Sequence, residues 1–293
     1  MKRVLVTGAN SYIGTSFENY ITANYAENYA VDTLDMQDAA WREWDFSPYD
    51  CVFHVAGIAH SDSGKISKER ETLYYAVNTD LTAETAEKAK TAGVKQFIYM
   101  SSIIVYGDSA PIGEKKRIAP QTEVSPSNCY GDSKVQAENK LRPMDSDTFK
   151  VVILRPPMIY GKNSKGNYPL LAKIARKLPV FPYVDNERSM LYVENLCEFV
   201  RLMIENEERG VFFPQNAEYG NTSQMVRQIA TAHGKKIALV KGFGWLLKGM
   251  SHLTGLVNKA FGNMSYDSDM SVYRENYIVC DMQESIARTE GTR

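Results

Sequence analysis

The chain has 293 residues, long enough for one large domain or two modest ones with a sizeable core. Its 44% hydrophobic and 24% charged residues are typical of a globular protein, and a formal net charge of -1 argues against a general nucleic-acid binder. No apolar run has the length of a membrane span or of a signal-peptide core. The four cysteines lie far apart without a CxxC pair, so we expect reduced thiols in a cytoplasmic protein and no metal site.

Residues 1–156 alternate short apolar runs with helical patterns. The apolar runs predict strands over 2–8, 29–35, 50–57, the start of 95–107, and 150–156. Helical spacing predicts helices over 11–25, 72–93 and 130–141, the second of them closed by Gly93. His54 ends a buried run, and we expect it to satisfy a core hydrogen bond. This alternation predicts an α/β fold of the Rossmann type, a doubly wound parallel sheet covered on both faces.

After Pro156 the pattern changes to prolines, a basic helix and short strands. We therefore expect a dinucleotide-binding domain over 1–160, with segments around 190–216 returning to it. Residues 161–293 are expected to form a smaller C-terminal α/β lobe that binds substrate. From about residue 216 the tail has an irregular pattern, apart from a last amphipathic helix in "ESIARTEGTR".

The stretch "TGANSYIG" lies between the first strand and the first helix and is typical of a phosphate-binding loop, with Ser11 in place of its middle glycine. Gly8 allows the tight turn there, and Gly14 allows the helix to pack closely on the strand. Serine is tolerated in the middle if its φ is negative, and its hydroxyl can donate to a phosphate oxygen. Asp35 ends the second strand, at about the 20-residue distance from the loop that is expected of the ribose-binding acid. Asp32 is the competing acid, but it lies inside the strand. An acid there favours NAD, with NADP as the alternative.

Two short motifs carry candidate chemistry. "YGDSK" places Tyr130 and Lys134 on the same side of a helix. A phenol with an ordinary pKa of about 10 is a poor base at neutral pH, but a neighbouring ammonium and a positive nicotinamide ring would lower that pKa. "MSSIIVYG" places Ser101 and Ser102 at the carboxyl end of a strand, where open α/β sheets bind ligands. A serine there can hydrogen-bond the substrate oxygen that the tyrosine deprotonates.

In order and spacing, "TGANSYIG", "VFHVAG", "VNTD", "SSIIVYG", "YGDSK" and "LRPPMIYG" resemble the extended short-chain dehydrogenase/reductase family, in its NAD-dependent epimerase/dehydratase group of nucleotide-sugar enzymes like UDP-glucose 4-epimerase. The resemblance is good over residues 1–215 and loose in the tail. It implies Tyr130 as the general acid and base, Lys134 as its partner and Ser102 as the ligand of the substrate oxygen. It also implies cofactor contacts at Gly8, Asn10, Ser11, Tyr12, Ile13, Gly14, Asp35, Ala56, Gly57, Ile58, Asn78, Ser101, Pro156 and Met158. Ser11, and more mildly Gly57, depart from the family's pattern.

The second lobe fits a nucleotide diphosphate sugar by the same resemblance. "ERSMLYVENL" resembles the segment that holds uridine or diphosphate, which implies Arg188, and "GKNSKGN" adds Asn167 as a substrate contact. A bidentate guanidinium suits phosphate geometry. The alternative for Arg188 is a surface ion pair with Glu187 or Asp185. "EKKR" (114–117) is expected to be a charged loop tip.

Three reactions share this arrangement: 4-epimerisation, 4,6-dehydration and 4-keto reduction. Dehydratases of the family carry acids directly after the active-site serine, whereas Ile103 and Ile104 follow Ser102 here. We expect a NAD-dependent epimerase that acts at C4 of a UDP-hexose or UDP-N-acetylhexosamine through a 4-keto intermediate, in polysaccharide biosynthesis. An NAD(P)H-dependent reductase of a UDP-4-keto-6-deoxy-hexosamine and a non-catalytic dinucleotide-binding regulator are the alternatives.

Two further expectations concern surfaces. The resemblance implies a homodimer that pairs through the helices after the third and fourth strands. The stretch over 241–262 is apolar with spaced lysines. It is expected to cap the substrate lobe, with a segment lying on a membrane surface as the alternative.

Overall fold

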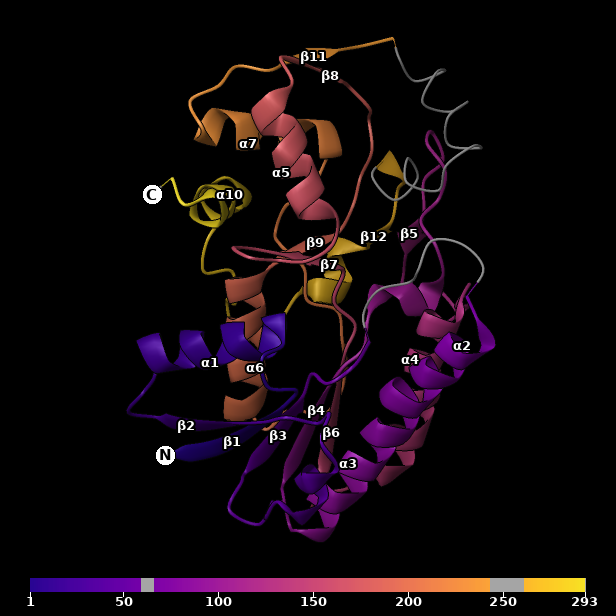
Figure 1. The fold of residues 1–293 in the computed structure, drawn as a ribbon, viewed down its shortest axis with the longest axis vertical. Coiled ribbons are helices and arrows are strands. Elements are labelled where there is room, and N and C mark those ends of the chain that lie inside the picture. Colours follow the sequence, from indigo (N-terminus) through magenta and orange to yellow (C-terminus); the bar gives the residue numbers. More distant parts are fainter. Residues whose placement is uncertain (59–65, 243–260, 293) are drawn as a thin grey trace. The chain divides into compact units, whose positions relative to one another are not determined.

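A computed structural model describes residues 1–58, 66–242 and 261–292 (Figure 1). The structure divides into two units, each assembled from several segments of the chain. Unit 1 comprises Met1–Gly107, Glu123–Pro156 and Leu196–Pro214. Unit 2 comprises Asp108–Thr122, Pro157–Asn195 and Gln215–Arg293. The chain first leaves unit 1 after Gly107, the glycine of "VYG", which follows a 3-10 turn.

Unit 1 is built on a parallel sheet whose strands are the apolar runs of the sequence. Its six strands lie in the order β10-β6-β4-β3-β1-β2, and every neighbouring pair is parallel. They are β1 (Lys2–Thr7), β2 (Tyr29–Leu34), β3 (Cys51–His54), β4 (Gln96–Met100), β6 (Lys150–Leu154) and β10 (Gly210–Phe212). The inner strands are buried along nearly their whole length, which is why they read as continuous apolar runs.

Helices cover both faces of this sheet (Figure 1). One face carries α1 (Tyr12–Asn24) and α6 (Val193–Glu205), and the other carries α2 (Lys68–Tyr75), α3 (Leu81–Thr91) and α4 (Cys129–Leu141). A π-helical turn at Ala76–Asp80 joins α2 to α3, and 3-10 turns lie at Ala39–Glu43, Ile103–Tyr106 and Arg142–Met144. The predicted Rossmann-type doubly wound sheet is therefore confirmed.

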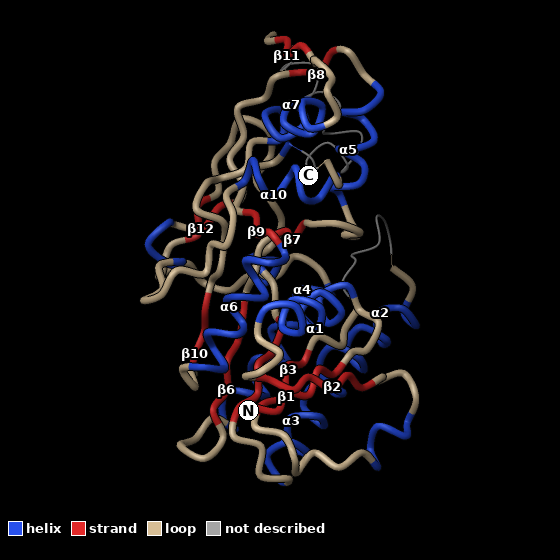
Figure 2. The backbone as a smooth tube through the Cα atoms, turned by 90° about the vertical axis from the view of Figure 1, so that its left-hand side faces the viewer, coloured by secondary structure: helices blue, strands red, loops and turns tan. Residues whose placement is uncertain are grey.

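Unit 2 combines short ladders with helices (Figure 2). Its described parallel ladders pair β5 (Arg117–Ile118) with β12 (Ser265–Tyr266), β7 (Met158–Tyr160) with β9 (Met190–Tyr192), and β8 (Val180–Pro182) with β11 (Ala238–Val240). The helices described in it are α5 (Asn167–Lys177), α7 (Thr222–Ala232) and α10 (Met282–Glu290), with a 3-10 turn at Ser268–Ser271. Helix α7 packs against both α5 and α10.

The structure differs from the sequence-based expectation in two places. The tail after residue 216 is not irregular, because α7 buries one face through Met225, Val226 and Ile229. Residues 108–122, expected with the first lobe, belong to unit 2 because β5 pairs with β12. Most of the stretch 241–262 lies outside the described residues. Within the described ranges, none of the helices combines the length and apolar content needed to cross a bilayer.

Candidate active site

The loop between β1 and α1 requires glycine at both ends. Gly8 has a φ of +117°, and a Cβ there would lie 2.8 Å from the backbone nitrogen of Ala56. A Cβ at Gly14 would lie 3.1 Å from the Val6 side chain and 2.8 Å from the hydroxyl oxygen of Ser11. Gly8 thus makes the tight turn and Gly14 lets α1 pack closely on β1, as expected of them.

Ser11 occupies the middle position of the loop without strain. Its φ is -73°, and its hydroxyl caps α1 by accepting a hydrogen bond from the Gly14 N–H at 3.1 Å. A hydroxyl that accepts in this way can still donate its own hydrogen. Asn10 beside it has a φ of 62°, a left-handed conformation that asparagine tolerates. Serine in place of glycine therefore leaves the helix N-terminus suited to a phosphate.

Asp35 lies where β2 ends beside this loop. The Leu34 carbonyl accepts a hydrogen bond from the Gly8 N–H at 2.8 Å, so the loop and the end of β2 touch. The Asp35 side chain is exposed. Asp32, inside β2, instead accepts a hydrogen bond from the Tyr49 hydroxyl at 2.9 Å. Of the two acids, Asp35 is the one that lies at the carboxyl edge of the sheet.

Ser102 and Tyr130 are brought together from different elements. Ser102 begins the 3-10 turn after β4, and Tyr130 lies in the first turn of α4, where the Ser102 side chain acts to lower the pKa of the Tyr130 phenol. Burial raises the pKa of Tyr130 to about 12 despite this effect. In the chain by itself, burial outweighs the stabilisation of the phenolate, and the lowering of the pKa expected with a positive nicotinamide ring beside Tyr130 stays a prediction.

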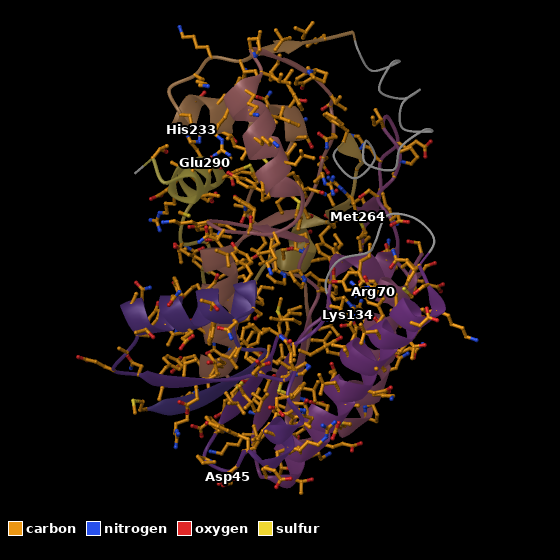
Figure 3. All side chains as sticks on the ribbon, viewed as in Figure 1. Asp45, Arg70, Lys134, His233, Met264 and Glu290 are labelled. Carbon is orange, nitrogen blue, oxygen red and sulfur yellow. The ribbon has the colours of Figure 1, made fainter. Side chains whose placement is uncertain are left out.

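Lys134 lies buried one turn further along α4 (Figure 3). Its ammonium donates to the Met100 carbonyl at 2.8 Å and lies 4.9 Å from the centre of the Tyr99 ring. A Cβ at Gly57 would come within 3.3 Å of this ammonium, so the small residue leaves room for it. Burial lowers the pKa of Lys134 to about 8, while the nearby Glu138 raises it. Lys134 is thus still mainly protonated at neutral pH.

The segment after β3 is fixed by Asn78 in the π-helical turn. The Asn78 side chain accepts from the Ile58 N–H at 2.8 Å, donates to the Ile58 carbonyl at 3.2 Å and donates to the Ser133 hydroxyl at 3.0 Å. The Ala56 N–H donates to the carbonyl of Thr7 at 2.8 Å. The Asn78 amide thus fixes the backbone of Ile58, in the segment after β3. The π-helical turn that carries Asn78 is of a kind that often occurs at functional sites.

The other predicted cofactor contacts divide between the two units. The Ser101 hydroxyl donates a hydrogen bond to the buried Glu138 carboxylate at 2.6 Å, so this hydroxyl points into the protein. The Pro156 carbonyl accepts the Ile103 N–H at 2.9 Å, within unit 1. Met158 belongs to unit 2. Tyr12 and Ile13 open α1 directly after the glycine loop.

Arg188, Asn167 and Met158 line one small pocket of unit 2. The pocket has a free volume of about 10 Å³, and its walls are Met158, Asn167, Leu171, Arg188, Met190, Gly220, Thr222 and Met225. Burial lowers the pKa of Arg188 to about 10, which leaves the guanidinium charged at neutral pH. Glu187 bonds to Arg117 at 3.2 Å. The structure therefore brings both predicted substrate contacts to one pocket.

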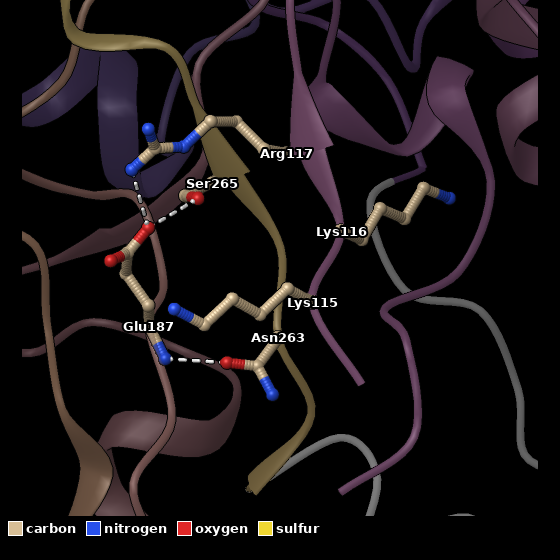
Figure 4. Close-up of a pocket in the computed structure, with 6 residues that line it drawn as sticks. All are labelled: Lys115, Lys116, Arg117, Glu187, Asn263 and Ser265. Carbon is tan, nitrogen blue, oxygen red and sulfur yellow. Dashed lines mark hydrogen bonds and ion pairs between the residues drawn. The ribbon is translucent and has the colours of Figure 1, made fainter. Parts of the chain in front are cut away.

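A larger cavity of about 300 Å³ lies elsewhere in unit 2 (Figure 4). Its walls are Lys115, Lys116, Arg117, Glu187, Asn263 and Ser265. Figure 4 shows the Glu187 carboxylate between Arg117 and Ser265, and the Lys116 ammonium donates to the Asp108 carbonyl at 2.8 Å. None of the predicted site residues lines this cavity.

Comparison with known proteins agrees with this geometry. The family model described as NAD dependent epimerase/dehydratase family matches residues 4–212. The UDP-glucose 4-epimerase of Vibrio cholerae is 29% identical over 289 residues, covering 91% of this chain and 87% of its own. The N-acetyl-alpha-D-glucosaminyl-diphospho-ditrans,octacis-undecaprenol 4-epimerase of Escherichia coli O157:H7 is 29% identical over 252 residues, covering 80% of this chain and 73% of its own.

Solved structures with the same fold have lower identity. A dTDP-4-dehydrorhamnose reductase from Clostridium acetobutylicum superposes with a TM-score of 0.75 at 17% identity, covering 98% of both chains. A UDP-glucuronic acid 4-epimerase from Bacillus cereus in complex with NAD superposes with a TM-score of 0.73 at 16% identity, covering 99% of this chain and 98% of that one. At such identities the likeness establishes the fold.

Proposed function

Because the chain belongs to the NAD dependent epimerase/dehydratase family, we propose that this enzyme is a NAD-dependent nucleotide-sugar epimerase. It would oxidise and re-reduce C4 of a UDP-hexose or UDP-N-acetylhexosamine. The observation that carries the proposal is the placement of three side chains: Ser102 acts on the pKa of Tyr130, and Lys134 lies one turn further along the helix that carries Tyr130. Both relatives described above are 4-epimerases by name.

The residues at the carboxyl edge of the sheet fit a dinucleotide. Gly8 and Ser11 leave the N-terminus of α1 open to a pyrophosphate, and the exposed carboxylate of Asp35 suits a ribose diol. An acid at that position disfavours a 2′-phosphate, which supports NAD over NADP. Bound NAD would supply the hydride acceptor and donor for the reaction at C4.

The chain's own groups would handle the proton at the C4 oxygen. Ser102 holds that oxygen by a hydrogen bond, and Tyr130 takes its proton and later returns it. With a pKa of about 12 in the chain alone, Tyr130 needs additional positive charge nearby to act as a base. Lys134 supports this role while it stays protonated, which its pKa of about 8 allows at neutral pH.

The second unit would hold the nucleotide diphosphate. Arg188 is charged at neutral pH, and its planar guanidinium suits a bidentate contact with phosphate oxygens. Asn167 lines the same pocket, where its amide can bind a polar group of the ligand. UDP is favoured by the name of one relative, and a lipid-linked diphosphate sugar by the name of another. We also propose a homodimer, on the family resemblance alone.

The deciding experiment is to identify the nucleotide that leaves the purified protein on denaturation. Near-stoichiometric NAD would indicate that the cofactor is recycled in place, and C4 inversion would then be assayed on UDP-glucose, UDP-N-acetylglucosamine and a diphospho-lipid-linked N-acetylglucosamine. Tyr130→Phe should reduce turnover about a thousandfold while NAD remains bound. A Tyr130→Phe protein with near full turnover would contradict the assignment.

A keto-sugar reductase is the second candidate, since it needs only the same serine, tyrosine and lysine. The observation that favours it is the likeness of the whole chain to dTDP-4-dehydrorhamnose reductases, one of them solved with NADP. A protein that releases no nucleotide but takes up NADPH from solution would support the reductase and count against the epimerase.

A further inference from the structure

A buried carboxylate lies behind the candidate active site. Glu138 is on α4, one turn after Lys134, and is only 1% exposed. Residues four apart on a helix share one side, so this carboxylate and the Lys134 ammonium are neighbours. The carboxylate acts on Lys134 electrostatically, since it raises the pKa that burial lowers.

Glu138 is held by groups from three other positions. The Ser101 hydroxyl donates to one carboxylate oxygen at 2.6 Å. The Arg155 guanidinium donates to both oxygens, at 3.0 Å and 2.5 Å, and Arg142 adds an ion pair at 3.2 Å. Arg155 also donates to the Tyr106 hydroxyl at 2.7 Å. The carboxylate therefore joins α4 to the ends of β4 and β6.

These contacts reach both chain neighbours of Ser102. Ser101, which bonds Glu138 directly, comes immediately before Ser102. Arg155 comes immediately before Pro156, whose carbonyl accepts the N–H of Ile103, the residue after Ser102. Ser102 is thus preceded by a residue that bonds the buried carboxylate and followed by one that bonds the chain neighbour of Arg155. The carboxylate lies on the helix that also carries Tyr130.

Stability alone does not account for a charge in this position. Desolvation of a buried ion pair offsets much of its Coulombic attraction, so well-packed apolar residues would stabilise the protein as well or better. What an apolar pair cannot supply is directed hydrogen bonding to Ser101 and a negative charge beside Lys134.

We infer that Glu138 is a positioning residue for the reaction, one that sets Ser102 against Tyr130 and keeps a negative charge one turn from the Lys134 ammonium. This inference rests on the proposed function, because it takes Ser102, Tyr130 and Lys134 as the reacting set. Arg155 would act with it by orienting the carboxylate.

Several other titratable or charged side chains surround Glu138 and Lys134. The groups that face Glu138 or Lys134 from neighbouring elements are Arg155 after β6, Arg142 after α4, Tyr106 in the 3-10 turn, Tyr99 on β4, His54 on β3 and Tyr130 on α4. Burial raises the pKa of Tyr99 and of Tyr106 and lowers that of His54 to about 3, so these three are neutral near pH 7. Removing the Glu138 charge should therefore lower the pKa of Lys134 further.

Glu138→Gln is the test, since glutamine keeps the size of the side chain and removes the charge. In full-length enzyme with its dinucleotide bound, we expect kcat to fall about 10- to 100-fold with KM changed less than about threefold. The alkaline limb of the kcat profile should move to lower pH. Lys140→Gln is the matched control: it removes an ion pair with Asp80 from the same helix, two residues on from Glu138 and facing another side, and should leave kcat and its pH profile unchanged.

A second readout does not depend on turnover. The pKa of Lys134 is followed by nitrogen NMR of lysine-labelled protein, with Lys134→Met to assign the signal. It should fall in Glu138→Gln and stay unchanged in Lys140→Gln. A protein without activity on any nucleotide sugar would end the proposed function, yet this pKa would still decide the electrostatic role of Glu138.

One outcome overturns the inference outright. If Glu138→Gln melts at a lower temperature but keeps the wild-type kcat profile and Lys134 pKa, the carboxylate is only structural. If the single variant does not fold because Arg155 is left buried without its partner, Glu138→Gln/Arg155→Gln removes both charges and takes its place. The same fall in kcat is expected there, whereas the Lys134 pKa should fall less because a positive charge is removed as well, and a wild-type kcat would overturn the inference equally.

Discussion

Single residues of the glycine loop differ in what their backbone permits. Gly8 has a positive φ and a backbone neighbour 2.8 Å from where a Cβ would stand, so both conformation and space exclude a side chain. Ser11 has an ordinary negative φ, and its side chain serves as the cap of α1. Serine in place of the loop's middle glycine is thus accommodated, because the backbone at Ser11 does not require glycine.

Gly8→Ala should weaken dinucleotide binding about tenfold or more and lower the free energy of unfolding by about 1–3 kcal/mol, because the chain must shift away from Ala56. Calorimetric titration with NAD and thermal melting measure the two effects. Gly113→Ala is the control: it also replaces a glycine of positive φ, 89°, but has no atom within 4 Å of the new Cβ. We expect Gly113→Ala to cost some stability and no NAD affinity. Wild-type affinity in Gly8→Ala would refute the assigned contact.

Between elements, His54 ties the sheet to the helix layer. Its ring nitrogens bond the Thr7 hydroxyl on β1 at 2.7 Å and the Thr82 hydroxyl on α3 at 3.1 Å, and its ring stacks on Phe97 of β4. The core hydrogen-bonding role predicted for His54 is thus confirmed. Burial, with a smaller contribution from Lys134, lowers its pKa to about 3, so the ring is neutral in the folded protein.

This neutral histidine makes the fold sensitive to acid. Between the ordinary pKa of 6.5 and the folded value of about 3, the unfolded chain binds a proton that the folded chain does not. Stability therefore rises with pH in this window and is lost as pH falls below 6.5. For His54→Gln we expect the loss between pH 6.5 and pH 4.5, measured by urea unfolding, to be about 2–3 kcal/mol smaller than in the wild type. An identical loss in both proteins would show that His54 does not titrate in this way.

At the scale of the whole molecule, the candidate contacts are divided between the two units. The glycine loop, Asp35 and the Ser102, Tyr130 and Lys134 set are in unit 1, whereas Arg188 and Asn167 are in unit 2. Each unit is assembled from segments distant in the chain, so neither corresponds to one continuous half of the sequence.

This division predicts separate responses to two ligands. In hydrogen exchange, NAD should slow amides at residues 8–14 of unit 1, and UDP should slow amides of α5 and around Arg188 in unit 2. Arg188→Met should abolish the protection by UDP and leave that by NAD intact. UDP that protects no segment of unit 2 would count against Arg188 and Asn167 as substrate contacts.

Several features followed from the sequence because they depend on near neighbours along the chain. Short apolar runs predicted five of the six strands of unit 1, all but β10, and the four-residue spacing of Tyr130 and Lys134 places them on one helix. The loop from Gly8 to Gly14 has its form because a strand, a turn and a helix follow one another within a few residues.

Other features were decided only by the tertiary structure. The pairing of β5 with β12 and the links of Glu138 to Ser101 and Arg155 join positions far apart in the chain, and no local pattern encodes them. The pKa of Tyr130 in the chain by itself depends on burial, which the sequence around it does not specify. Local geometry thus came from the sequence, whereas long-range contacts and desolvation, which set the charge of the site, came from the fold.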